Sequence, residues 1–204
     1  MAAPATRYAF LVDTYRTERL KTLSVWSQIP DDRMGLRPEP RARTPLEHMV
    51  HQCLSEDGWM TTMLGITTGM PALPAEESRL SFLAHYAAAS DRRERALAEQ
   101  SDVWFEEQTA FFDVQRSRAW VLVRRIAHSA HHRGQLTTYL RLSGLGLYST
   151  YGPTADTGGL PKSGGHVVYP YRSIAELLEG VRDGRPTQQL PRPGSSPPTE
   201  RPGK

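Results

Sequence analysis

The chain has almost no cysteine, no long apolar run and no large excess of charge, and each absence excludes a class of protein. Cys53 is the single cysteine among 204 residues, which excludes an intramolecular disulfide and a zinc site built from several cysteines. No apolar stretch approaches the ~20 residues of a membrane-spanning helix. The net charge is only +3, and acidic residues are interleaved with the basic ones. We therefore expect neither a membrane nor a nucleic acid as partner.

The remaining bulk properties are those of a globular domain. Hydrophobic residues make up 38% of the chain, and its length is sufficient for one domain with a core of its own. Residues 1–20 lack a charged segment followed by an uninterrupted apolar one, so no signal peptide is predicted. A cytoplasmic location is the resulting expectation.

Apolar residues at three- and four-residue spacing predict mostly helical structure. Thr44, Pro45 and Glu47 form the pattern of a capping box with proline at the first helical position. Gly144 is placed as the stop of the helix that contains the histidine cluster. The predicted helices cover residues 7–29, 45–64, 78–100, 116–142 and 173–184.

Three segments do not fit this pattern. Residues 101–115 have too little periodicity to assign and leave room for an extended piece. Residues 144–171 are rich in Gly, Pro, Ser and Thr, and predict a long loop of unassigned role. Residues 185–204 contain six prolines and one leucine, which predicts a disordered tail. We therefore expect an all-α domain over residues 1–184, with a four-helix bundle as its architecture, followed by a tail over 185–204.

The stretch HSAHHRGQL, residues 128–136, holds three of the seven histidines. On a helix, His128 and His132 project from one face, one turn apart, and can bind one metal ion together. His131 lies to the side of that face. A third ligand has to come from another helix, where His48 and His51 are candidates. Their spacing leaves the choice open, with His51 slightly favoured.

Two longer motifs resemble the DinB family (DinB/YfiT-like proteins). In TPLEHMVHQCLSEDGW, a His followed five residues later by Glu and then by an aromatic residue matches His51, Glu56 and Trp59, whereas His48 would put Cys53 in the Glu position. WVLVRRIAHSAHHRGQLTTYLRLSG resembles the second metal helix of that family, and LYSTYGPTADTGG resembles the loop that follows it in one subgroup. The resemblance covers residues 5–181.

The resemblance implies a four-helix bundle with up-down-down-up topology and a divalent-metal site formed by His51, His128 and His132. Three neutral imidazoles leave coordination positions for water or substrate, as catalytic sites do, and Zn or Ni suits such ligands. Characterised members include thiol S-transferases, some of which use mycothiol or bacillithiol. The resulting hypothesis is a metal-dependent S-transferase or hydrolase acting on a small electrophilic substrate. The alternative is a non-catalytic metal-binding protein of a stress response.

Several neighbours are candidates for the pocket or for holding the ligands in place. Gln135 and Tyr139 continue the face of His128 and His132. Glu47 lies one turn before His51 and is a candidate hydrogen-bond acceptor for its second ring nitrogen, although the capping box explains Glu47 equally well. His48 and His131 are expected to pack beside the site rather than bind the ion. A ferritin-like di-iron site is excluded, because no Glu has a His three residues later.

A homodimer is the expected assembly, partly because the resemblance implies it, since many DinB-like proteins are described as dimers. Five exposed aromatic residues also exceed what one core of this size needs, and most closed oligomers are two-fold dimers. These residues are Tyr8, Tyr15, Trp104, Phe111 and Phe112. The alternative is that the loop over residues 144–171 covers these aromatic residues within one chain.

Overall fold

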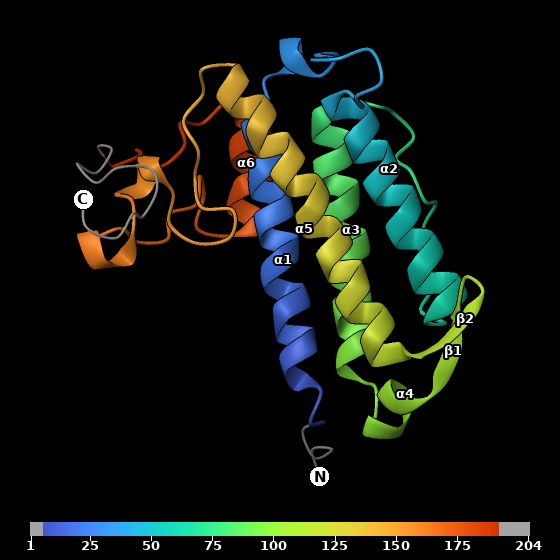
Figure 1. Ribbon diagram of the computed structural model, residues 1–204. Helices are drawn as coiled ribbons and strands as arrows, with labels where there is room; N and C mark the ends of the chain where they lie inside the picture. Colours follow the sequence, from blue (N-terminus) through green and yellow to red (C-terminus); the bar gives the residue numbers. More distant parts are fainter. Residues whose placement is uncertain (1–5, 192–204) are drawn as a thin grey trace.

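The computed structural model describes residues 6–191, and four long helices dominate it (Figure 1). They are α1 (Ala9–Gln28), α2 (Pro45–Gly58), α3 (Arg79–Ala98) and α5 (Arg118–Leu142). The other elements are η1 (Asp31–Arg33), η2 (Trp59–Met63), α4 (Asp102–Glu106), β1 (Gln108–Phe111), β2 (Val114–Ser117), η3 (Ala155–Thr157), η4 (Pro161–Ser163) and α6 (Ile174–Asp183). Within the described residues, no helix is long and apolar enough to cross a membrane.

The long helices run up, down, down and up along the chain (Figure 1). α1 packs along both α3 and α5, and α2 also lies against α5. The segment 64–78 carries the chain back along the length of α2, so α2 and α3 run in the same direction. The prediction of an all-α fold is confirmed, and the arrangement is consistent with the expected four-helix bundle.

Polar side chains fix where the helices begin. Thr44 accepts a hydrogen bond from the Glu47 backbone at 3.1 Å, and the Glu47 carboxylate accepts one from the Thr44 backbone at 2.8 Å. This is the predicted capping box, with Pro45 at the first position. Serine side chains cap the next four α-helices at Ser78, Ser101, Ser117 and Ser173. Fixed helix starts set which residues of α2 and α5 face one another.

Two apolar clusters fill the bundle, one toward each end. The first includes Trp26, Met49, Phe82 and Leu136. The second includes Leu11, Met60, Leu97, Phe105 and Leu122. Between the two clusters, α2, α3 and α5 each contribute a buried charged residue: Glu56, Arg93 and Arg125.

Glu56 is the centre of this charged layer and is 1% exposed. Its carboxylate accepts hydrogen bonds from the Tyr15 hydroxyl at 2.5 Å and the Tyr86 hydroxyl at 3.0 Å. The guanidinium of Arg93 lies 3.4 Å from it and that of Arg125 lies 3.9 Å away. A buried charge is tolerated only when it is paired and hydrogen-bonded, and Glu56 meets both conditions.

The segment that the sequence left unassigned forms α4 and an antiparallel β-hairpin. Phe111 pairs with Val114, so the turn between the strands has two residues, Phe112 and Asp113. Phe112 has φ +54°, and it is the single non-glycine residue with positive φ in the described part of the chain. Two-residue hairpin turns favour Gly or Asn at such a position.

The helix predicted over residues 45–64 is not one uninterrupted α-helix. α2 ends at Gly58, and Trp59–Met63 form a π-helical turn in which Leu64 donates to the Trp59 carbonyl at 3.2 Å. π-helical turns inside helices occur frequently at functional sites. Periodicity does not reveal one, because a single wider turn changes the apolar spacing by only one residue.

The predicted tail begins with residues that contact the domain. The Gln188 backbone donates to the Pro170 carbonyl at 2.9 Å, and the Tyr148 hydroxyl donates to Thr187 at 2.8 Å. These backbone and hydroxyl contacts are not encoded in the apolar content from which the tail was predicted. Residues 192–204, the rest of that prediction, lie outside the described residues.

The aromatic residues on which the expected dimer rested are mostly packed within the chain. Tyr15 is 4% exposed. Tyr8 stacks on Phe105 at 4.9 Å between ring centroids, and Trp104 contacts the same ring at 5.0 Å. Phe112, at 69%, is the strongly exposed member of the set. The expected excess of exposed aromatic side chains is therefore not observed, because Tyr8, Tyr15 and Trp104 pack against other residues of the chain. The homodimer itself stays a prediction.

Candidate metal centre

The three histidines assigned as ligands lie together in the structure. His51 comes from α2, and His128 and His132 come from α5. One ring nitrogen of each lies within 4.8 Å of the others. The Nε2 atoms of His51 and His128 are 3.4 Å apart, and those of His128 and His132 are 3.1 Å apart. Among the described residues, this is the one cluster of His, Cys, Asp or Glu with the spacing of a metal site.

These separations fit a divalent ion. Two nitrogens about 2.0–2.1 Å from one ion at a tetrahedral angle are separated by about 3.3 Å. Both measured Nε2 separations lie close to that value. Three nitrogen donors and no carboxylate in the cluster suit a borderline ion such as Zn²⁺ or Ni²⁺.

Burial keeps the imidazoles neutral, which is the state that binds a metal. It lowers the pKa of His128 to about 3, with a further contribution from the positive charge of Arg125. Burial also lowers the pKa of His132 to about 4 and that of His51 below its usual value. At neutral pH, each ring therefore presents a lone pair.

Gln135 fixes the orientation of one ligand. Its Oε1 lies 2.8 Å from Nδ1 of His132, three residues earlier on α5. An amide oxygen only accepts, so Nδ1 carries the proton and Nε2 is left free toward His128. Metal-binding histidines commonly use such an acceptor to set their tautomer. The sequence placed Gln135 beside the site, and the structure gives it this contact.

His128 is held by packing instead. Its Nδ1 is buried and has no hydrogen-bond partner among the described residues. The Trp59 ring stacks on its imidazole, with 5.6 Å between centroids and 26° between planes. The guanidinium of Arg125 lies 5.5 Å from the centroid of the same indole. Trp59 therefore restrains the His128 ring from the side.

The structure places the other candidates around this cluster. His48 is 2% exposed, and its ring lies 5.3 Å from that of His132 and 5.8 Å from that of Tyr139. The Tyr139 hydroxyl donates to the Arg43 carbonyl at 2.8 Å, which ties the start of α2 to α5. His131 is exposed, with its ring 5.0 Å from that of His132. All three border the cluster without belonging to it.

Glu47 requires a correction, because it does not support His51. Its carboxylate accepts from the Thr44 backbone at 2.8 Å and from Arg37 at 2.6 Å. Being one turn before His51 does not bring it to that ring, since the capping interaction directs the side chain toward the helix start. The capping explanation is the one that the geometry supports.

The charges around the cluster are positive. After burial, the largest influences on the pKa of His51 are the guanidiniums of Arg43 and Arg125, and both lower it. Arg43 also lowers the pKa of His48 and His132. A positive environment disfavours protonated imidazoles and favours an anionic ligand at the open side of the site.

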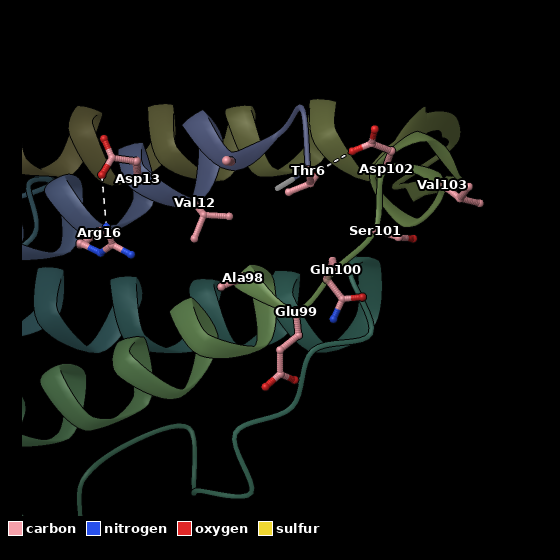
Figure 2. A pocket seen from close by; sticks show the side chains of 11 residues that line it. Thr6, Val12, Asp13, Arg16, Ala98, Glu99, Gln100, Ser101, Asp102 and Val103 are labelled. Carbon is pink, nitrogen blue, oxygen red and sulfur yellow. Dashed lines mark hydrogen bonds and ion pairs between the residues drawn. The ribbon is translucent and has the colours of Figure 1, made fainter. Parts of the chain in front are cut away.

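Two other features lie away from this chemistry. Burial raises the pKa of Cys53 to about 12, so it packs as a neutral thiol, as expected from its place on α2. A groove of about 970 Å³ lies between the start of α1 and the end of α3, lined by residues such as Val12, Arg16 and Asp102 (Figure 2). None of its lining residues belongs to α2 or α5, which carry the histidines.

The sequence placed Trp59 in the family motif but did not assign it to the site. Trp59 follows His51 by eight residues, about two helical turns, and this spacing was the available signal. Phe111 and Phe112 lie 5.2 and 6.1 Å from the Trp59 ring, but they reach it only through a hairpin that periodicity did not predict.

Comparisons with known proteins agree with the fold and the motifs. A crystal structure of a DinB-like protein from Bacillus cereus ATCC 10987 matches with a TM-score of 0.60 and 20% identity, covering 69% of this chain and 95% of that one. A DinB-like protein (YjoA) from Bacillus subtilis matches with a TM-score of 0.55 and 14% identity, covering 70% and 97%. At these identities, the likeness concerns the fold alone.

A sequence relative and a family model add similarity at the level of the sequence. The uncharacterized protein YrdA of Bacillus subtilis (strain 168) is 31% identical over 102 residues, 48% of this chain and 61% of that protein. This chain therefore aligns with less than two thirds of the length of that relative. The model of the DinB family matches residues 3–158, which include all four long helices. On this match and the fold, the chain belongs to the DinB family.

Proposed function

We propose that the protein binds one divalent metal ion, Zn²⁺ or Ni²⁺, through His51, His128 and His132, and that it is an enzyme acting on a small electrophilic substrate. The observation that carries the proposal is the convergence of three neutral ring nitrogens from two helices, with Nε2 separations of 3.4 and 3.1 Å. A bound ion would supply Lewis-acid activation of a water molecule or a thiol at neutral pH.

The protein residues prepare the site for such chemistry in three ways. Burial keeps the imidazoles unprotonated. Gln135 and Trp59 hold two of the rings in place. Arg43 and Arg125 add positive charge beside the histidines, which favours the anionic form of a bound thiol or water. His51 and His128 are only half-buried, so one side of the cluster remains accessible.

Three histidines leave coordination positions open, and this distinguishes the proposal from a structural site, where protein ligands fill the sphere. A low-molecular-weight thiol such as mycothiol or bacillithiol is the proposed co-substrate for S-transfer, and water is the co-substrate for hydrolysis. The competing function, a metal-binding protein without catalysis, uses the same ligands.

Ligand substitutions test the metal site. We expect His51→Ala, His128→Ala and His132→Ala each to weaken Zn²⁺ binding well beyond the ~10–100-fold that loss of an outer contact costs, since three ligands leave no redundancy. His48→Ala is the matched control, because His48 is buried beside the cluster and should leave stoichiometric binding intact. Elemental analysis measures the metal content of each variant, and calorimetric titration measures its affinity for Zn²⁺. Full metal content in the His128 variant would contradict the assignment.

A turnover screen tests the catalytic part. The metal-loaded protein is assayed with mycothiol, bacillithiol or water and a panel of model electrophiles, with the His132→Ala variant as background. Turnover that the variant loses supports the enzyme. Stoichiometric metal binding with no turnover by any thiol or water would favour the non-catalytic alternative.

A further inference from the structure

An aromatic wall extends from the metal centre to the tip of the β-hairpin. It consists of Trp59, Phe111, Phe112 and Trp120. Phe111 links Trp59, at 5.2 Å between ring centroids, to Trp120, at 4.9 Å. Trp59 in turn stacks on His128. The wall is thus continuous with a proposed metal ligand at one end.

Phe112 is the unusual member of the wall. Its side chain is 69% exposed and meets the edges of Trp59 at 6.1 Å and Phe111 at 4.8 Å. Its backbone has φ +54°, in the left-handed region that bulky side chains rarely adopt. Folding alone favours Gly or Asn at this turn position. An exposed phenyl ring kept at a strained position next to a metal site indicates a role in binding.

The outer end of the wall carries positive charge. The guanidinium of Arg116 lies 5.3 Å from the Trp120 ring centroid, and that of Arg124 lies 5.9 Å from it. Among the described residues, neither forms an ion pair with a carboxylate; Arg116 donates to the Gln115 carbonyl. Each guanidinium is therefore available for a charge-assisted contact with an anion at this end of the wall.

We propose that the aromatic wall is the substrate subsite, and that it takes a flat aromatic ring bearing a carboxylate or similar anionic group. Ring-to-ring contact with Phe112 and Trp59 recognises the aromatic part, and Arg116 and Arg124 recognise the charge. The inference rests on the proposed metal-dependent function and names its substrate class. A surface for a second copy of the chain would also use exposed aromatics, but it does not explain two guanidiniums without carboxylate partners at the outer end of the wall.

Binding of 1-naphthoate tests the proposal, with octanoate as an aliphatic anion and 1-naphthamide as a neutral ring. Phe112→Asn removes the ring and keeps a residue that tolerates positive φ, so the turn is preserved. Phe10→Ala is the matched control, because Phe10 is 62% exposed on α1, away from the wall. Dissociation constants are measured by calorimetry with the Zn²⁺-loaded full chain and repeated with metal-free protein.

Phe112→Asn should weaken 1-naphthoate binding by about 2- to 12-fold, the range for one aromatic pair, while Phe10→Ala leaves it unchanged. The Arg116→Gln/Arg124→Gln double variant should weaken 1-naphthoate roughly two- to tenfold and leave 1-naphthamide within about twofold. Equal binding of octanoate and 1-naphthoate, or no effect of Phe112→Asn, would overturn the proposal. The proposal would also be overturned if Phe112→Asn changed the mass in solution from that of a dimer to that of a monomer while its affinity for 1-naphthoate stayed the same.

Zinc titration of the same samples separates this inference from the function on which it rests. If the chain binds no metal but Phe112→Asn still weakens 1-naphthoate, the subsite stands and the metal proposal fails. If the chain binds metal and 1-naphthoate is insensitive to every wall variant, the metal proposal stands and the subsite fails.

Discussion

Replacing Gln135 by methionine tests whether a single hydrogen bond sets the metal affinity. Methionine keeps the length and volume of the side chain but cannot accept from Nδ1 of His132, which is 2.8 Å from the Gln135 Oε1. Without this acceptor, the proton of His132 is free to occupy Nε2, the nitrogen that faces His128 at 3.1 Å. Loss of an outer contact of this kind costs about 10–100-fold in metal affinity, which is about 1.4–2.7 kcal/mol.

Competition with a chromophoric zinc chelator at pH 7.5 measures the effect. Gln135→Glu supplies a stronger acceptor at the same position, so we expect affinities in the order Glu, Gln, Met. Gln100→Met is the matched control. Gln100 lines the groove between α1 and α3, away from the histidines, and its side chain donates to the Ala96 carbonyl. If Gln135→Met binds Zn²⁺ within about twofold of the unmodified protein, the hydrogen bond does not set the tautomer and the reasoning fails.

Two further predictions concern stability. The pKa of His128 is about 3 and that of His132 about 4, below the ~6.5 of an unfolded chain. The unfolded state therefore binds more protons between about pH 4 and 6.5, so the stability of the metal-free protein should be constant above that range and fall as the pH drops through it. Urea unfolding at pH 7.5, 5.5 and 4.5 measures this, and an equal loss in the His128→Gln/His132→Gln double variant would refute the assignment. Glu56→Leu should cost about 3–5 kcal/mol, because it leaves Arg93 and Arg125 buried without their carboxylate. An unchanged urea midpoint would show that solvent reaches this layer.

The capping box and the helix pattern were predictable because they are local. Thr44 and Glu47 are three residues apart, and a hydrogen bond between them depends only on the turn of helix that they share. The same locality explains why His128 and His132 could be paired from their spacing. Gly144 adopts the positive φ that a helix stop needs, as its residue type predicted.

Contacts between elements were not predictable in this way. Spacing left His48 and His51 nearly equal, and family resemblance rather than geometry favoured His51. The structure places His51 in the cluster and buries His48 beside His132, since the crossing of α2 and α5 determines which turn of α2 faces the site. For Glu47, nearness along the helix suggested a hydrogen bond to His51. Its carboxylate instead accepts from the Thr44 backbone and from Arg37, so it does not reach His51.

The sequence by itself determined the long helices, the cap at Thr44 and the pairing of His128 with His132, because these follow from local hydrogen bonding, residue type and linear spacing. Resemblance to the DinB family supplied the choice of His51. Only the tertiary structure decided that three ring nitrogens converge, that Trp59 restrains His128, and that a hairpin brings Phe111 and Phe112 to the same site. Phe112 and Trp59 are more than 50 residues apart in the chain. Their contact depends on how the hairpin packs against the turn η2 that follows α2, and no local pattern encodes that packing.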